Sequence, residues 1–105
     1  MTDVYEATKQ FPREEIYGLT SQMRRCAISI PSNIAEGHGH SSRKSYLRYL
    51  DIAVGSLCEL QTQLIIARNL KFLDSTVFAT LENRSRELER MLSALMRSLR
   101  RKPTK

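Results

Sequence analysis

The sequence is poor in the residues that punctuate or cross-link a chain, since its 105 residues include no tryptophan, four glycines, three prolines and two cysteines. So few turn residues exclude a domain of many short strands. Two cysteines cannot form the disulfide framework of a small secreted protein. Cys26 and Cys58 lie among apolar neighbours, so we expect both to be small buried hydrophobic side chains. What remains is dominated by helix-forming residues.

The sequence also lacks segments that would direct it into or across a membrane. No apolar run approaches the roughly 20 residues of a membrane-spanning helix. The first ten residues, MTDVYEATKQ, carry acidic side chains and no apolar signal core. We therefore expect a cytoplasmic protein that forms one domain over 1–105 and makes no membrane contact.

Positive charge is in excess, and it is concentrated near the end of the chain. The net charge is +6, and residues 84–105, with eight basic and two acidic side chains, account for all of it. A local basic excess attracts polyanions such as nucleic acid. The alternative is a solvated helix face whose cations favour the negative end of the helix dipole.

Two long helices are indicated by apolar residues at heptad spacing. One stripe advances in steps of three and four from Tyr46 to Ala67, and a second from Phe78 to Leu99. The spacing predicts helices over about 42–68 and 75–101, the first roughly 42 Å long. A second apolar stripe on the first of these helices requires partners on more than one side.

Polar residues mark the ends of these two helices. Ser41 or Ser42 can cap the free amides at the start of the first, and Asp74 or Ser75 those of the second. Asn69 can adopt the left-handed conformation that closes a helix. The corner between the helices is short, so we expect them to pack antiparallel.

Two further helices are expected upstream. Apolar residues from Leu19 to Ile34 predict a helix over about 19–36 that continues, kinked, through Pro31; the alternative is a break there, with Ser32 capping a separate turn. The segment 2–10 could form a helix only roughly 14 Å long. Either the natural start lies upstream, or another subunit covers the exposed stripe. The prediction is an all-α, antiparallel up-down four-helix bundle with a short first helix, which oligomerises.

The stretch 29-SIPSNIAEGHGHSSRKSYLRYL-50 has the composition of a binding loop. A phosphate-binding loop needs glycines between a strand and a helix, whereas Gly37 and Gly39 follow a helix. His38 and His40 do not supply the four ligands of a structural zinc site, so we expect solvated loop histidines. The prediction is a structural corner with no metal and no cofactor.

The polar residues of this corner fit a structural role better than a catalytic one. We expect the small residues 53–56 to receive 30–33, held by hydrogen bonds between polar side chains. Glu36 and Glu59 could instead bind a metal as in a nuclease, but a two-metal site needs more carboxylates, so we expect no enzyme. The residues of this expected polar lock are Ser32, Asn33, Glu36, Ser56 and Glu59.

Several runs resemble the bacterial four-helix-bundle proteins named for intervening sequences inside 23S rRNA genes. They are 17-YGLTSQMRRCAISIPSNIAEG-37, 42-SRKSYLRYL-50, 52-IAVGSLCELQTQL-64 and the corner 70-LKFL-73. The resemblance covers about Phe11 to Leu99 and implies a bundle that assembles as a barrel-like homopentamer. Similar proteins include the accessory variability protein of diversity-generating retroelements, a basic pentamer that partners a reverse transcriptase and nucleic acid.

Taken with the charge, the resemblance implies a non-catalytic oligomer that binds RNA or DNA, a ribonucleoprotein, or a partner protein such as a reverse transcriptase. Repetition around a ring multiplies phosphate contacts, and we expect backbone contacts without base specificity. Arg25 could instead pair with Glu59 or Glu36. The alternative function is a protein–protein scaffold without a nucleic-acid role, favoured by the wide apolar surface. The expected nucleic-acid-binding residues are Arg24, Arg25, Arg43, Lys44, Arg48, Arg97, Arg100, Arg101 and Lys102.

Overall fold

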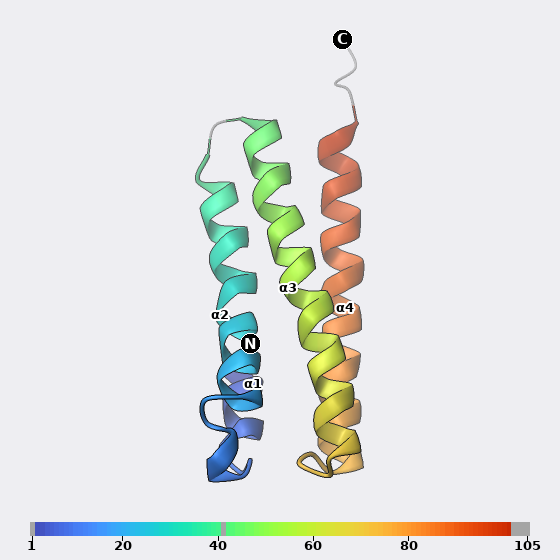
Figure 1. The fold of residues 1–105 in the computed structure, drawn as a ribbon. Helices are drawn as coiled ribbons and strands as arrows, with labels where there is room; N and C mark the ends of the chain where they lie inside the picture. The colour runs from blue at the N-terminus through green and yellow to red at the C-terminus, as the bar shows by residue number, and fades with distance from the viewer. Residues whose placement is uncertain (1, 41, 102–105) are drawn as a thin grey trace.

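The computed structural model describes residues 2–40 and 42–101, which form an all-α protein. Four α-helices run up and down in sequence order, the first much shorter than the others (Figure 1). The predicted four-helix fold class is confirmed, and each helix begins and ends within two residues of its expected bounds. The elements are α1 (Thr2–Thr8), the 3₁₀ helix η1 (Arg13–Glu15), α2 (Leu19–His38), α3 (Arg43–Asn69) and α4 (Ser75–Arg100).

Helix α3 is the centre of the bundle, with α2 along one side and α4 along the other (Figure 1). The short α1 packs on α2 near the start of that helix and touches α4 less extensively. In the described part of the chain, α2 and α4 do not pack on each other. The bundle is elongated, about 55 × 23 × 17 Å, and its core depends on α3.

The predicted heptad stripe of α3 forms the core. Six of its members, from Leu50 to Ala67, are at most 1% exposed. In α4 the predicted seam is buried at Phe78, Leu81 and Leu92, while its remaining leucines are partly buried. The six buried residues of α3 are Leu50, Ala53, Leu57, Leu60, Leu64 and Ala67.

The starts of α3 and α4 are capped as the sequence predicts. The Ser42 hydroxyl accepts a hydrogen bond from the Ser45 amide at 3.0 Å, and the Asp74 carboxylate accepts one from the Val77 amide at 2.8 Å. Each cap satisfies an amide that has no partner within its helix.

The end of α3 differs from the prediction, because Lys71 and not Asn69 adopts the left-handed conformation, with φ of 65°. The Phe72 amide donates to the Ala67 carbonyl and the Lys71 amide to the Arg68 carbonyl, both at 2.9 Å. This pair of bonds is the Schellman motif, whose left-handed position favours glycine. Asn69 remains helical, and the turn falls two residues later than expected.

Helix α2 continues through Pro31, as favoured over a break there. Its close contact with α3 lies further along, at Gly37, where a Cβ atom would come within 2.8 Å of Tyr49 Cβ and 2.9 Å of Tyr46 Cδ1. Gly55, expected to lie in a small-residue notch, is exposed, and a Cβ there would meet nothing within 4 Å. The glycine required for helix approach is therefore Gly37.

Helix α1 is attached mainly through one apolar side chain and a few polar contacts. Val4 is 0% exposed, and Asp3 forms an ion pair with Arg84 of α4. Just beyond α1, the rings of Phe11 and Phe72 lie 5.5 Å apart and join the segment before α2 to the α3–α4 corner. With seven residues, α1 covers only a fraction of the 27-residue α3.

Helix α3 is long and apolar enough to cross a membrane by length and composition, which the sequence reading did not anticipate. It is nevertheless the partly buried central helix of the bundle. Its apolarity reflects contacts on two sides together with an uncovered outer face that includes Ile52, Ile65 and Ile66.

Candidate nucleic-acid interface

The antiparallel packing of α3 and α4 brings the start of one helix to the end of the other (Figure 1). A guanidinium nitrogen of Arg43, the first residue of α3, donates to the Arg101 carbonyl at 3.1 Å. Residues 58 positions apart in the sequence therefore form one surface, which we call the basic end. Its exposed cations are Arg43, Lys44, Arg48, Arg97, Arg100 and Arg101.

The charge of the basic end is largely uncompensated. Arg100 lies 3.8 Å from the carboxylate of Asp51, a solvent-exposed pair that is worth little. In the described residues, the other five cations of the basic end form no ion pair. The positive dipole end of α3 lies at this surface together with the negative ends of α4 and α2, so the helix dipoles together do not add to its positive charge.

Two histidine–tyrosine pairs flank the basic end at the α2–α3 corner. The ring centroids of His40 and Tyr49 are 5.0 Å apart, and those of His38 and Tyr46 are 5.9 Å apart. His38 is the last residue of α2 and not a loop residue, and both histidines are exposed. These pairs were not predicted from the sequence. The signal that could have indicated them is Gly37, a small residue that allows α2 and α3 to approach closely at this corner.

Arg24 and Arg25 lie elsewhere. They are about 14 residues before the end of α2, roughly 20 Å along the helix from the corner. Arg24 donates to the Thr8 hydroxyl at 2.9 Å and lies over the Tyr5 ring, so it holds α1 in place. Arg25 donates to Gln22 and lies 4.0 Å from Glu59. Lys102 lies outside the described residues.

The structure forms a smaller polar lock than the sequence predicted. The hydroxyls of Ser29 and Ser56 are 2.8 Å apart, and the Asn33 amide donates to the Ser29 hydroxyl at 3.0 Å and to its carbonyl at 2.8 Å. Ser29 is the member that joins the two helices, and it was not among the predicted five.

The other three predicted lock residues, Ser32, Glu36 and Glu59, are exposed and lie outside this network. Ser32 makes no side-chain hydrogen bond among the described residues. Glu36 lies 3.8 Å from His40, and Glu59 accepts from the Gln63 amide at 3.4 Å and approaches Arg25. Among the described residues, Ser32 and Glu36 make no contact of this kind with α3, whereas Glu59 reaches Arg25 of α2 as an exposed ion pair apart from the Ser29–Ser56 network.

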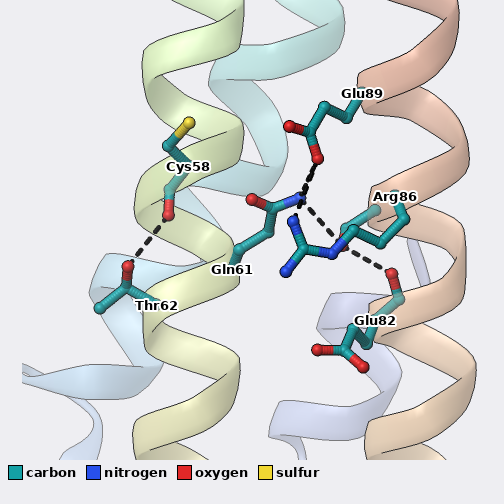
Figure 2. A network of polar contacts seen from close by, with 7 residues as sticks. Cys58, Gln61, Thr62, Glu82, Arg86 and Glu89 are labelled. Atoms are coloured by element: carbon teal, nitrogen blue, oxygen red, sulfur yellow. Dashed lines mark hydrogen bonds and ion pairs between the residues drawn. The ribbon is translucent and has the colours of Figure 1, made fainter.

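A second polar network joins α3 to α4 (Figure 2). The Gln61 amide donates to the Glu89 carboxylate at 3.1 Å, and Arg86 also donates to it at 3.2 Å. These hydrogen bonds, led by the one from Gln61, lower the pKa of Glu89 below its usual 4.5. The Ser85 hydroxyl, fully buried beside them, donates to the Glu82 carbonyl at 2.8 Å.

The remaining polar groups of the described residues do not gather into a metal-binding set. Across residues 2–40 and 42–101, no group of three or more His, Cys, Asp or Glu side chains could hold a metal ion. Cys26 is buried, and burial raises the pKa of its thiol, so it is not an activated nucleophile. Cys58, predicted to be buried, is exposed, because the apolar surface of α3 is wider than its neighbours cover.

Comparison with protein families identifies a family over most of the chain. The model of the 23S rRNA-intervening sequence protein family matches residues 1–94, nearly the whole chain. No curated protein matches the chain. The match spans all the described α1, α2 and α3 and most of α4, so this chain belongs to the 23S rRNA-intervening sequence protein family.

Proposed function

We propose that this protein is a non-catalytic, self-associating helical bundle whose basic end binds the phosphate backbone of nucleic acid. The observation that carries the proposal is the gathering of six exposed cations where α3 begins and α4 ends, with Asp51 as their one ion-paired carboxylate among the described residues. Lysine and arginine contacts to phosphate release condensed counterions, which favours binding at low salt. A ribonucleoprotein is a partner of the same kind, because its nucleic acid presents the same phosphates, and so is a reverse transcriptase that carries its nucleic acid.

Backbone contacts without base specificity fit this surface. Tyr46 and Tyr49 are half-buried and engaged by the two histidines, so they do not offer the open ring faces on which unpaired bases stack. Four phosphate contacts to a single strand would give a slope of about −3 in log K against log salt.

The test uses two double variants of α4 that change the net charge equally. Arg97→Gln with Arg101→Gln removes two cations from the basic end, and Arg86→Gln with Arg90→Gln removes two from the middle of the same helix. Fluorescence anisotropy with a labelled single strand, from about 50 to 200 mM salt, measures the slope. We expect the first pair to reduce its magnitude by about 1.4 and the second to change it much less. Equal effects of the two pairs, or no binding at low salt, would overturn the proposal.

Self-association is supported by the outer face of α3. Ile52 and Ile66 are 47% and 42% exposed, and they share a helix face with Gly55, which has open space around it. Apolar residues gathered on one exposed face mark interaction surfaces. A ring of five copies, as the family resemblance implies, would also repeat the basic end five times and multiply its phosphate contacts.

Light scattering tests this part separately. We expect the mass to be a multiple of 12.1 kDa, and Ile52→Ser with Ile66→Ser to reduce it. Met91→Ser, at the exposed Met91 of α4, is the control and should leave the mass unchanged. A protein that self-associates but binds no oligonucleotide at low salt would instead be a protein–protein scaffold.

A further inference from the structure

A second cationic feature lies far from the basic end, where α1, η1 and the start of α2 meet (Figure 1). A pocket of about 330 Å³ opens there, and Lys9, Arg13 and Arg24 contribute to its lining. Among the described residues, no carboxylate lines it. The volume is in the lower range of small-molecule sites.

Its positive charge comes mainly from the two arginines, because the Lys9 ammonium is paired with Glu6 at 2.7 Å. Arg13 is exposed, and in the described part of the chain its side chain makes no ion pair or hydrogen bond. Arg24 is held by the Thr8 hydroxyl at one nitrogen and by the Tyr5 ring against its face. Its two terminal nitrogens have no partner among the described residues, so an oriented guanidinium edge remains for an anion.

Thr20 adds a neutral hydrogen-bond donor to the lining of this pocket. It lines the pocket and is only 4% exposed, yet its hydroxyl makes no hydrogen bond to any described residue. Gln63 Oε1, and not this hydroxyl, is the buried polar atom without a partner among the described residues, so the Thr20 hydroxyl still reaches the pocket and can donate to a ligand there. It also lies in the first turn of α2, whose positive dipole end is partly offset by the Glu15 carboxylate, which accepts from the Leu19 amide at 3.3 Å.

We propose that this pocket binds a phosphate group, held by Arg13, Arg24 and the Thr20 hydroxyl. Pro12 and Ile16 form an apolar wall beside these groups, which suits the organic part of a phosphate ester. The phosphate can belong to a small phosphomonoester or to a nucleic-acid chain. The site uses no residue of the basic end, so it goes beyond the nucleic-acid surface proposed above.

Calorimetry at low salt tests the site with four probes: inorganic phosphate, adenosine monophosphate, and a short single strand with and without a 5′-phosphate. The variants are Thr20→Val, which removes the hydroxyl at nearly constant volume, and Arg13→Gln. Arg86→Gln, distant on α4, is the control with the same charge change as Arg13→Gln. We expect the wild type to bind adenosine monophosphate, and each pocket variant to weaken that binding about tenfold, as for a lost hydrogen bond to a charged group. The control and the Arg97→Gln, Arg101→Gln double variant should bind it as the wild type does.

The oligonucleotides identify the source of the phosphate. Pocket-dependent binding that requires the 5′-phosphate assigns the site to phosphomonoesters, and equal pocket-dependent binding of both strands assigns it to the nucleic-acid backbone. Absence of binding by all four probes would overturn the proposal, and so would equal weakening by Arg13→Gln and Arg86→Gln. Circular dichroism of Thr20→Val checks that the fold is retained. Loss of oligonucleotide affinity in the basic-end variant alone bears on the proposed function and not on this site.

Discussion

The two glycines of the long helices provide a matched test of how α2 and α3 pack. Gly37→Ala and Gly55→Ala are the same substitution within helices of similar character. At Gly37 the added methyl group would lie 2.8 Å from Tyr49 Cβ and 2.9 Å from Tyr46 Cδ1. At Gly55 it would meet nothing within 4 Å.

The expected changes have opposite signs. Alanine is favoured over glycine in a helix interior by about 1 kcal/mol, which applies in full at Gly55 and less at Gly37, the last residue but one of α2. At Gly37 this gain is opposed by overpacking, typically about 1–3 kcal/mol, because the atoms met are a Cβ and a ring carbon and not the free ends of flexible side chains. The Tyr46 carbonyl, 3.3 Å from the added atom, further limits relaxation of α3. We therefore expect Gly55→Ala to raise the free energy of unfolding by up to about 1 kcal/mol and Gly37→Ala to lower it by about 1–2 kcal/mol.

Thermal and urea unfolding, followed by circular dichroism, measure the difference. For a domain of this size, 1 kcal/mol corresponds to about 4–8 °C in Tm. Light scattering on the same samples shows whether each variant has the subunit number of the wild type, because association changes apparent stability. If Gly37→Ala melts at or above the wild-type temperature, α2 and α3 do not approach closely at this corner and the packing described here is wrong.

Three further predictions concern the turn, the polar lock and acid stability. Lys71→Gly should raise the free energy of unfolding by about 1 kcal/mol by relieving a left-handed lysine, whereas Leu70→Gly, at a right-handed position, should lower it in the same urea titration. Ser29→Ala should lower the free energy of unfolding by about 1 kcal/mol. Because the two hydroxyls bond each other, Ser56→Ala should lower it less in the Ser29→Ala background than in the wild type. If the two effects are strictly additive, the shared hydrogen bond is contradicted. The pKa of Glu89 is lowered in the folded state, so its contribution to stability is present above pH 4.5 and is lost as the pH falls through the lower folded value. Glu89→Gln should therefore flatten the dependence of Tm on pH below about 4.5. An unchanged dependence would count against the Gln61–Glu89 hydrogen bond.

The sequence was sufficient where a local pattern determines the structure. Heptad spacing located the buried stripe of α3, and Ser42 and Asp74 marked helix starts because a side-chain oxygen there bonds an amide three residues on. The end of α3 was misplaced because residue preference favours Asn69, whereas the chain turns at Lys71, next to Phe72, whose ring packs at a tilt against that of Phe11.

The sequence did not predict features that depend on which face of a helix is turned toward its neighbour. A single glycine in a helix does not reveal whether it faces a neighbour, so Gly55 was preferred over Gly37. Cys58 was misplaced for the same reason. The sequence showed where cations are frequent but not which of them share a surface. Arg24 donates to Thr8, 16 positions away, whereas Arg43 donates to the Arg101 carbonyl, 58 positions away.

The central claim is that nucleic acid binds at the basic end, where α3 begins and α4 ends. The most direct test is to locate the contact along the chain. Hydrogen exchange followed by mass spectrometry, with and without a single-stranded oligonucleotide at low salt, maps the contact whatever the subunit number. We predict slower exchange in peptides covering 36–50 and 94–101, and little change over 66–80 at the opposite end of the bundle. Protection confined to the α3–α4 corner, or no protection at saturating oligonucleotide, would contradict the assignment.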